Sequence, residues 1–405
     1  CFRRHTILFD ISRKILSRDL ILVAISLITW GVGEGMFFFF QSLYLQELGA
    51  DPLKIGGILG GVGLAMTISY LPAGVLSDRI GRRPLIHGAW IIATCATALM
   101  AFAKTLPIFT AGMILYGLTG FVTVPLNSYI TAARGKLSVG RTLTLISASF
   151  NLGSILGPLI GGWVASQAGL QTNFRLAMII FVLSTAVILF IRPQPVEAPI
   201  PGEGRSGLRF LLNERYLRYT ALMFLVMFGL YLSQPLTPNF LLNERGVDLL
   251  RMGQLISARS VGIVLFSLTL GQLNARVGFL AAQAGMALFN LFIWLGSGFS
   301  FYLAGYMLMG SYITARNLAI AQSRALVRSD NMGAAYGFLE TIMSLAIVLG
   351  PPLAGYLYEL QAEWMYWVSL ALIFIGVSAS LVFSPVRRAD VQAFEEKERA
   401  EWIQS

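Results

Sequence analysis

The sequence has little of the charge that a soluble protein of its length carries. Only 12% of its 405 residues are charged and 56% are hydrophobic, whereas about a quarter of an ordinary soluble domain is charged. Two cysteines and two histidines are too few for a disulfide framework, and their spacing matches no structural metal site. These shortages exclude a large soluble domain and indicate an integral membrane protein.

Several functional signatures are also missing. The pattern G-x-x-x-x-G-K-[ST] does not occur, which excludes a primary ATP-driven pump. No nucleophile is spaced against a base, so the sequence predicts no enzyme. The net charge of +10 falls in short segments between apolar runs and forms no basic patch interleaved with aromatics. Nucleic acid is therefore excluded as a partner, and the bilayer, a small-molecule substrate and a monomer without a cofactor are predicted.

Twelve apolar runs have the length, about 20 residues, that a helix needs to cross a bilayer. The predicted spans are 19–43, 53–76, 84–104, 107–131, 142–165, 174–192, 216–241, 252–274, 279–298, 300–322, 334–358 and 363–384. The fold class is therefore an all-α membrane protein with twelve transmembrane helices.

Prolines and glycines between Pro193 and Gly207 break any helix and divide the spans into six and six. The predicted parts are an amphipathic N-terminal segment at 1–18, a six-helix bundle at 19–192, a linker at 193–215, a second six-helix bundle at 216–384 and a tail at 385–405. The first and last parts are expected to be helices that lie on the membrane surface.

Lysine and arginine are distributed unevenly between the two ends of the spans. Of the 30 cations, 24 fall on or near the side of both termini, Arg316 among them, five fall on the other side, and Arg259 lies deep within a span. Because cytoplasmic loops collect Lys and Arg, both termini are predicted to be cytoplasmic. The protein is expected in the cell (inner) membrane, which it crosses many times.

The two halves are repeats of each other. Residues 45–56 return as residues 242–253, 197 positions later. The same offset pairs Gly74 with Gly271, Arg79 with Arg276 and Gly81 with Gly278. A parallel repeat of six spans predicts two pseudo-symmetric six-helix bundles.

The segment between the second and third spans compresses four charges into six residues. Its pattern, G-x-x-x-D-R-x-G-R-R, is formed by Gly74, Asp78, Arg79, Gly81, Arg82 and Arg83. An ordinary loop that only sets topology would have no need of both glycines. The pattern resembles the cytoplasmic loop between helices two and three of the major facilitator superfamily of transporters. This resemblance implies that the motif holds the bundles together on the cytoplasmic side.

The fifth span carries a second motif, formed by Gly153, Gly157, Pro158, Gly161 and Gly162. It resembles the Gly-Pro motif of the exporters in that superfamily, although Thr144 stands where a further glycine is expected. Proline kinks a helix and small residues allow close crossings, so Gly157 and Pro158 are predicted to pack span five against the second bundle. Simple helix packing is the alternative, and the resemblance favours export over uptake.

Four ionisable side chains stand out because they lie well inside the spans: Glu34, Arg259, Arg316 and Glu340. Such groups are costly in a bilayer and are functional candidates for that reason. Arg316 and Glu340 lie at equal depth and are predicted to form an ion pair, which would serve a site or only lock the second bundle. Arg259 is predicted to be either the partner of Glu34 or an anchor for an anion.

Glu34 is the strongest candidate because glycines and aromatic residues, including Trp30 and Phe37, surround it. Apolar surroundings favour the protonated form of a carboxyl group, so Glu34 is predicted to exchange a proton or to bind a cationic substrate. A glutamate that is merely hydrogen-bonded to a neighbouring helix is the alternative.

Polar groups and a wall of Phe and Met complete the predicted site. The polar candidates are Asn127, Tyr129, Gln234, Asn239 and Asn317, with Tyr231 and Phe38 to Phe40 beside them. A Met- and Phe-rich wall adapts to varied apolar ligands. The same apolar residues would serve equally as filler that faces lipid.

The resemblance implies two bundles that rock about a central site lined by spans one, four, seven and ten. The predicted function is secondary active export of small amphipathic or apolar compounds, driven by a proton gradient. Proton-driven exporters of the superfamily usually have an arginine where this chain has Tyr116, so a sugar or metabolite carrier without proton coupling is the alternative. A membrane sensor or lipid-binding scaffold is a further alternative.

Overall fold

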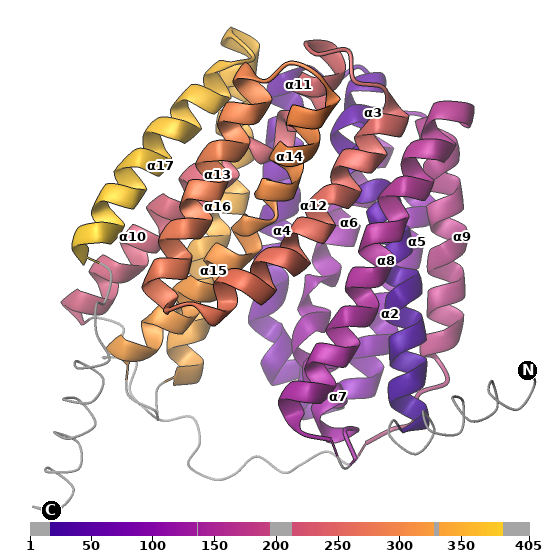
Figure 1. Ribbon diagram of the computed structural model, residues 1–405. Helices are drawn as coiled ribbons and strands as arrows, with labels where there is room; N and C mark the ends of the chain where they lie inside the picture. Colours follow the sequence, from indigo (N-terminus) through magenta and orange to yellow (C-terminus); the bar gives the residue numbers. More distant parts are fainter. Residues whose placement is uncertain (1–16, 136, 195–212, 328–331, 384–405) are drawn as a thin grey trace, which may run out of the picture.

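The computed structural model describes residues 17–135, 137–194, 213–327 and 332–383, in which every regular element is a helix. Figure 1 shows these helices standing side by side in two groups, one indigo to magenta and one red to yellow. The predictions for residues 1–16, for most of the linker and for the tail lie outside the described residues.

The first group contains spans one to six. Span one consists of α2 (Arg18–Phe37), η1 (Phe38–Phe40) and α3 (Gln41–Glu47); span two is α4 (Pro52–Ile80), span three α5 (Arg82–Phe102); span four consists of α6 (Leu106–Gly117), η2 (Leu118–Val122) and α7 (Thr123–Ala132); span five is α8 (Val139–Ala168) and span six α9 (Leu170–Ile188).

The second group contains spans seven to twelve. Span seven consists of α10 (Glu214–Tyr231), η4 (Gln234–Leu236) and α11 (Thr237–Asn243); span eight is α12 (Leu249–Thr269), followed by η5 (Leu270–Gln272); span nine is α13 (Ala275–Leu295); span ten consists of α14 (Phe299–Met309) and α15 (Ser311–Ser323), followed by η6 (Arg324–Leu326); span eleven is α16 (Met332–Leu360) and span twelve α17 (Trp364–Phe383).

These elements confirm the all-α membrane fold. Within the described part of the chain, 11 helical stretches are long and apolar enough to cross a membrane. The one predicted span missing from these 11 is span ten. It is divided at Gly310 into α14 and α15, neither of which is long enough alone to cross a membrane.

The halves repeat in detail at the turn after their first spans. Gly49 and Gly246 both adopt positive φ, 86° and 65°, a conformation that residues with a Cβ atom rarely adopt. Asp51 and Asp248 then cap the next helices, and each carboxylate accepts a 2.8 Å hydrogen bond from a backbone N–H three residues later. The structural repeat agrees here with the predicted offset of 197 positions.

The register changes before the third spans, and the predicted equivalence of Gly81 and Gly278 is wrong. Gly81, with φ 85°, directly precedes α5, whereas Asn274 occupies the same place before α13. Gly278 lies inside α13, where a Cβ atom would meet the carbonyl oxygen of Leu270 at 2.6 Å. The second half is therefore shorter by four residues at this point.

Spans one, four, seven and ten are each interrupted along their length. The 3-10 turns η1, η2 and η4 interrupt the first three, and Gly310 divides the fourth. A broken helix weakens backbone hydrogen bonds, which a membrane protein tolerates where the break is buried in protein or lines a cavity.

Two helix pairs form the seams between the halves: α4 with α16 and α8 with α12. Gly162 of α8 and Gly253 of α12 approach so closely that a Cβ atom on either would lie 2.8 Å from the Cα atom of the other. Gly60 of α4 meets α16 in the same way, because a Cβ atom added to it would lie 2.7 Å from the carbonyl oxygen of Val348. Glycine lets these backbones touch.

The prediction that Gly157 and Pro158 pack span five against the second bundle is confirmed for Pro158 and wrong for Gly157. Cβ atoms at Gly153, Gly157 and Gly161 would each lie under 3.0 Å from carbonyl oxygens of α2, in the first bundle. Only Gly162 and the carbonyl of Pro158 face α12. The motif therefore holds spans one and five together and places one glycine at the seam.

One end of the molecule, at the top of Figure 1, carries α3, α11 and the turns that follow them; we call it the closed end. There Gln46 Oε1 accepts hydrogen bonds from Asn239 Nδ2 (2.7 Å) and Asn243 Nδ2 (3.1 Å). Asn239 Nδ2 also donates to the Ser42 carbonyl (3.1 Å), and Asn243 Nδ2 to the Tyr358 hydroxyl (3.2 Å). Uncharged hydrogen bonds therefore join the two halves at this end.

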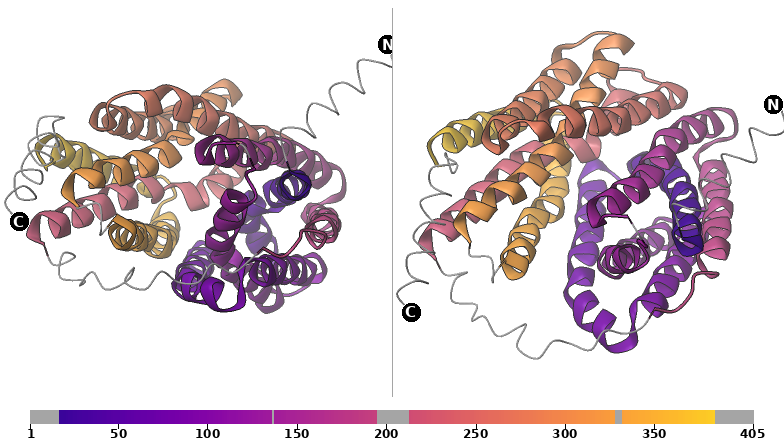
Figure 2. Two further views of the ribbon diagram at one scale, coloured as in Figure 1. Left: turned by 90° about the horizontal axis from the view of Figure 1, so that it is seen from below. Right: turned by 60° about the horizontal axis from the view of Figure 1, so that its bottom comes forward.

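The opposite end of the molecule is the one at which α2 begins and α9 ends. Figure 2 shows it from below and tilted forward, and the two groups of helices lie beside each other as separate bundles. The seams and the amide network thus join bundles that remain distinct units.

Candidate functional site

A cavity of about 690 Å³ lies between the two bundles. Spans one to five, seven, eight and eleven line it, whereas span ten, which was predicted to do so, contributes no residue to the described lining. Most of the wall is apolar, and its neutral polar side chains include Gln41, Ser42, Tyr70, Tyr116, Thr119, Thr123, Asn127, Ser147, Tyr231 and Gln234. Its size and composition suit a small molecule.

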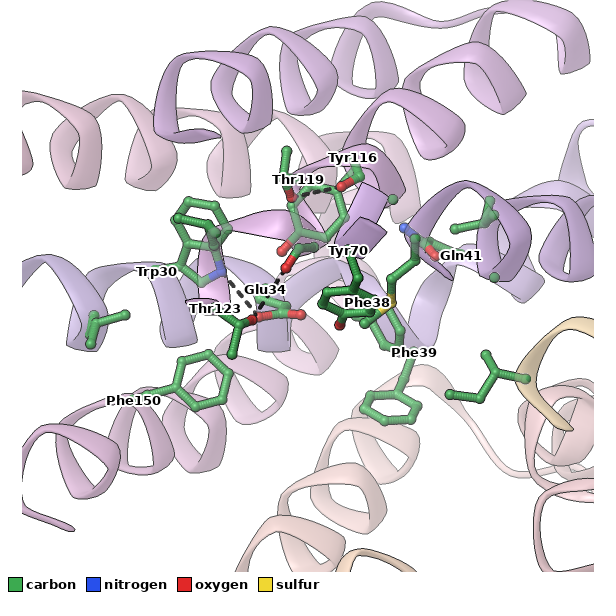
Figure 3. A pocket seen from close by; sticks show the side chains of 18 of the residues that line it. Trp30, Glu34, Phe38, Phe39, Gln41, Tyr70, Tyr116, Thr119, Thr123 and Phe150 are labelled. Atoms are coloured by element: carbon green, nitrogen blue, oxygen red, sulfur yellow. Dashed lines mark hydrogen bonds between the residues drawn. The ribbon is translucent and has the colours of Figure 1, made fainter. Parts of the chain in front are cut away.

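Glu34 projects from α2 just before the break at η1. Its Oε2 atom accepts a 3.1 Å hydrogen bond from the indole Nε1 of Trp30, one helical turn earlier. The hydroxyl of Tyr116, on span four, donates a second hydrogen bond to the carboxyl group, and Figure 3 shows both donors converging on it. Glu34 is thus bonded to a neighbouring helix and also lines the cavity, so the two sequence-based hypotheses do not exclude each other.

The donors are themselves held by aromatic packing. The Trp30 ring lies 4.5 Å from the ring of Trp90 and 4.9 Å from that of Phe181, between centroids. Tyr116 packs edge-on against Phe37 at 5.0 Å. Because these rings are packed in the first bundle, the orientation of the Glu34 carboxyl is fixed in advance.

Tyr116 occupies the position at which the resemblance led us to expect an arginine. Its hydroxyl donates to Glu34, whereas an arginine would bring a positive charge to the same carboxyl. The site therefore has a neutral donor where a charged one was expected, and Glu34 has no cationic partner in the part of the chain that the structure describes.

Arg259 lies on the other side of the interface, on α12. Its guanidinium carbon is 4.8 Å from the centre of the Phe39 ring, a cation–π contact between the halves. Its buried Nε atom has no hydrogen-bond partner among the described residues, and these include Glu34, with which it forms no ion pair. The hypothesis that Arg259 pairs with Glu34 is therefore wrong for this conformation.

The structure brings together six of the nine predicted substrate or proton residues at the cavity: Trp30, Glu34, Asn127, Tyr231, Gln234 and Arg259. Phe37 is not part of the lining, because it is fully buried in an aromatic cluster with Phe174 and Phe181. Glu34 and Phe37 lie on the same helix, α2, but point in different directions around its axis, one toward the cavity and the other into the core.

Arg316 and Glu340 form the predicted ion pair but lie outside the described lining. Arg316 Nε donates to Glu340 Oε2 at 3.0 Å, and its Nη2 donates to the same oxygen. The two residues belong to α15 and α16 of the second bundle, so the pair ties spans ten and eleven together. This geometry favours the hypothesis that the pair locks that bundle.

Three further polar candidates also lie away from the cavity. The Tyr129 hydroxyl donates to the Arg192 carbonyl at 2.9 Å, Asn239 belongs to the closed-end network, and Asn317 is exposed.

The cavity has further lining residues that were not predicted from the sequence, among them Gln41, Tyr70, Trp90, Thr119 and Phe150. Gln41 directly follows three phenylalanines at the helix break, and a polar residue at such a point was a usable signal. Trp90 and Phe150 lie in spans three and five, where nothing in the apolar pattern distinguishes a cavity face from a lipid face.

The charged motif after span two is more compact than the loop that was expected. α4 continues to Ile80, and Gly81 alone separates it from α5. Arg82 Nη1 donates to Gln194 Oε1 at 3.3 Å, which links the start of span three to the segment that follows span six, and Arg83 lies in the first turn of α5. The side chains of residues 71–79, which include Asp78 and Arg79, lie outside the described part.

Two six-span bundles, four broken spans and a single half-buried acid in the described lining of an apolar central cavity are the features of a membrane transporter. The family model described as Major Facilitator Superfamily matches residues 21–278 and 219–404, and the chain belongs to this family.

Relatives and solved structures agree with that assignment. An uncharacterized MFS-type transporter of Methanocaldococcus jannaschii is 22% identical over 90% of this chain and 98% of its own length. The class C tetracycline resistance protein of Escherichia coli is 28% identical over 78% of this chain and 82% of its own. A solved structure of a point mutant of the nucleoside transporter NupG has a TM-score of 0.77 at 12% identity and covers 90% of this chain and 100% of its own. The chain thus resembles drug-resistance members of the superfamily in sequence and a nucleoside transporter in fold.

Proposed function

We propose that the protein exports small amphipathic or apolar compounds in exchange for protons, by alternating access. One observation carries this proposal: Glu34 is the single carboxyl group among the described residues that line an apolar cavity, and two neutral donors hold it. A carboxyl group in such surroundings exchanges a proton more readily than it tolerates an unpaired charge.

The interface between the bundles suits alternating access. The closed end is held by neutral amide groups, and glycine contacts form the seams. Neutral hydrogen bonds contribute about 1 kcal/mol each, so a few of them hold one conformation without making the exchange to another conformation prohibitive.

The direction of transport rests on charge and on relatives. The 24 cations on the side of the termini favour a cytoplasmic position in the cell (inner) membrane for the end at which α2 begins. A relative named for tetracycline resistance favours export of a compound taken up from that side. In this proposal the protein acts as a monomer without a cofactor, and its partners are the bilayer and the transported compound.

The test is flux in proteoliposomes with an imposed pH gradient. A panel of three naphthalene derivatives of matched size, one neutral, one anionic and one cationic, would be offered as substrate. We expect the gradient to drive accumulation of at least one compound and a protonophore to abolish it. Equal rates with and without the gradient would contradict proton coupling.

A carrier of sugars or metabolites without proton coupling is the second candidate. The amide side chains of Gln41, Asn127 and Gln234 in the lining favour it, because amides suit hydroxyl-rich compounds. In that case the same proteoliposomes would equilibrate a sugar or nucleoside at a rate that does not depend on the gradient.

A further inference from the structure

We propose that the cavity binds compounds that carry one anionic group on an apolar body, and that Arg259 pairs with the anion. The inference rests on the proposed function, because it takes the central cavity as the transport site. It narrows the class of compound from amphipathic in general to amphipathic anions such as aromatic carboxylates.

The first observation is an unpaired cation inside a span. Arg259 lines the cavity, and its guanidinium forms no ion pair with any carboxylate that the structure describes. Arg316, the other arginine predicted to lie well inside a span, is paired with Glu340. An unpaired charge at this depth is costly, and an anionic ligand would supply the missing partner.

The second observation is that Glu34 does not supply this partner. Its carboxyl group already accepts hydrogen bonds from Trp30 and Tyr116, both within the first bundle. Arg259 belongs to the second bundle and rests on the ring of Phe39. A guanidinium that lies over an aromatic face keeps its edge N–H groups available, and these match a carboxylate in geometry.

The third observation concerns the helix that carries the arginine. Ser257 and Ser260, on either side of Arg259, donate hydrogen bonds of 2.8 and 3.0 Å to the carbonyl oxygens of Ile155 and Ser154 in α8. These bonds fix α12 in rotation at the seam, so the arginine is presented from a rigid element. The apolar wall then receives the rest of the ligand.

The test compares two probes of equal shape, 2-naphthoate and 2-naphthamide, by isothermal titration calorimetry on the full chain in lipid nanodiscs. We expect naphthoate to bind at least about tenfold more tightly than naphthamide, because a charge-assisted pair is stronger than a neutral hydrogen bond. Arg259→Gln should remove this preference while naphthamide affinity stays within about twofold. Arg259→Lys should keep part of the preference, because it keeps the charge and loses the planar fork.

Arg251→Gln is the matched control. Arg251 lies on the same helix, is exposed, and pairs with Asp248 near the closed end, so its removal should leave both affinities unchanged. Equal affinities of the two probes for the unaltered protein would overturn the inference, and this comparison needs no variant. An equal loss of both probes in Arg259→Gln would also overturn it, since a purely structural arginine would act in that way.

Binding and flux separate this inference from the proposed function. A clear naphthoate preference without flux driven by a pH gradient refutes the proposed export and leaves the anion site standing. Gradient-driven flux of naphthamide together with equal binding of both probes refutes the anion site and leaves the export proposal standing.

Discussion

Trp30 Nε1 donates a 3.1 Å hydrogen bond to Oε2 of Glu34, one turn further along the same helix. An indole N–H can donate to a carboxylate and, more weakly, to the carbonyl oxygen of a protonated carboxyl group. The pair therefore accommodates Glu34 with or without its proton while the indole stays in place. Such a neutral support suits a group that must be loaded and unloaded in each transport cycle.

Glu34→Gln keeps the shape and most of the hydrogen bonding of the protonated side chain and removes its titration. We expect downhill exchange of a neutral probe to persist and uphill, gradient-driven transport to fall at least about tenfold. Both rates are measured in the same proteoliposomes. A selective loss of cationic probes would instead indicate that Glu34 binds a cationic substrate.

Glu363→Gln is the control for that experiment. Glu363 also accepts a 3.1 Å hydrogen bond from an indole, that of Trp294, but it is not among the residues that line the cavity. Uphill transport should survive this change. If Glu34→Gln behaved like the control for every compound, Glu34 would be a structural residue.

Gly157→Ala should destabilise the first bundle. The new Cβ atom would overlap a carbonyl oxygen of Val32 in α2, so the two helices must separate, at a cost of about 1–3 kcal/mol. Gly57→Ala, where no atom lies within 4 Å of the added Cβ, is the matched control. Thermal unfolding in detergent should show a lower Tm for Gly157→Ala alone, and equal Tm values for the two variants would contradict the packing described here.

Asn239→Leu should weaken the closed end. The change removes two hydrogen bonds that join α11 to span one, and each contributes about 1 kcal/mol. Spin labels at positions 47 and 244, one in each half, should report a larger share of long distances at this end. Gln254→Leu, an exposed position on α12, is the control, and an unchanged distance distribution in Asn239→Leu would show that the amide network does not hold the bundles.

Asp78→Asn should abolish transport while probe affinity stays within a few-fold. This prediction comes from the charged motif, whose family resemblance implies a conformational role at the cytoplasmic end. Asp51→Asn is the control, because Asn caps a helix about as well as Asp. Flux and calorimetry are measured on the same preparations, and the spin-label distances report the conformational distribution. A large loss of affinity in Asp78→Asn with that distribution unchanged would place Asp78 in binding instead.

Much of the fold could be predicted because its signals are local. The length of an apolar run indicates a span, and Gly49 and Asp51 recur at Gly246 and Asp248 because the turn and the cap are set by adjacent residues. The ion pair of Arg316 and Glu340 was predictable from depth, since rise per residue is constant along a helix.

The candidate site was predictable only in part, because rotation about a helix axis is not visible in an apolar sequence. Phe37 and Phe39 are equally apolar, yet Phe37 is packed inside the first bundle and Phe39 contacts Arg259 across the cavity. In a water-soluble protein the apolar face of a helix is the buried one, and the polar face is exposed. In a membrane protein both faces are apolar, because lipid and protein interior are alike in polarity.

The sequence by itself determined that the chain crosses a membrane in two repeated halves and that Glu34, Arg259, Arg316 and Glu340 are the ionisable groups to examine. The tertiary structure alone decided that Glu34 is held by Trp30 and Tyr116, while Arg259 has no counter-charge among the described residues. The physical reason is that an ionisable group is costly inside a bilayer, so its presence within a span can be recognised from the residue type alone. A partner on another helix, as Tyr116 is for Glu34, is not visible in the sequence, because only the packing of the helices brings the two within reach.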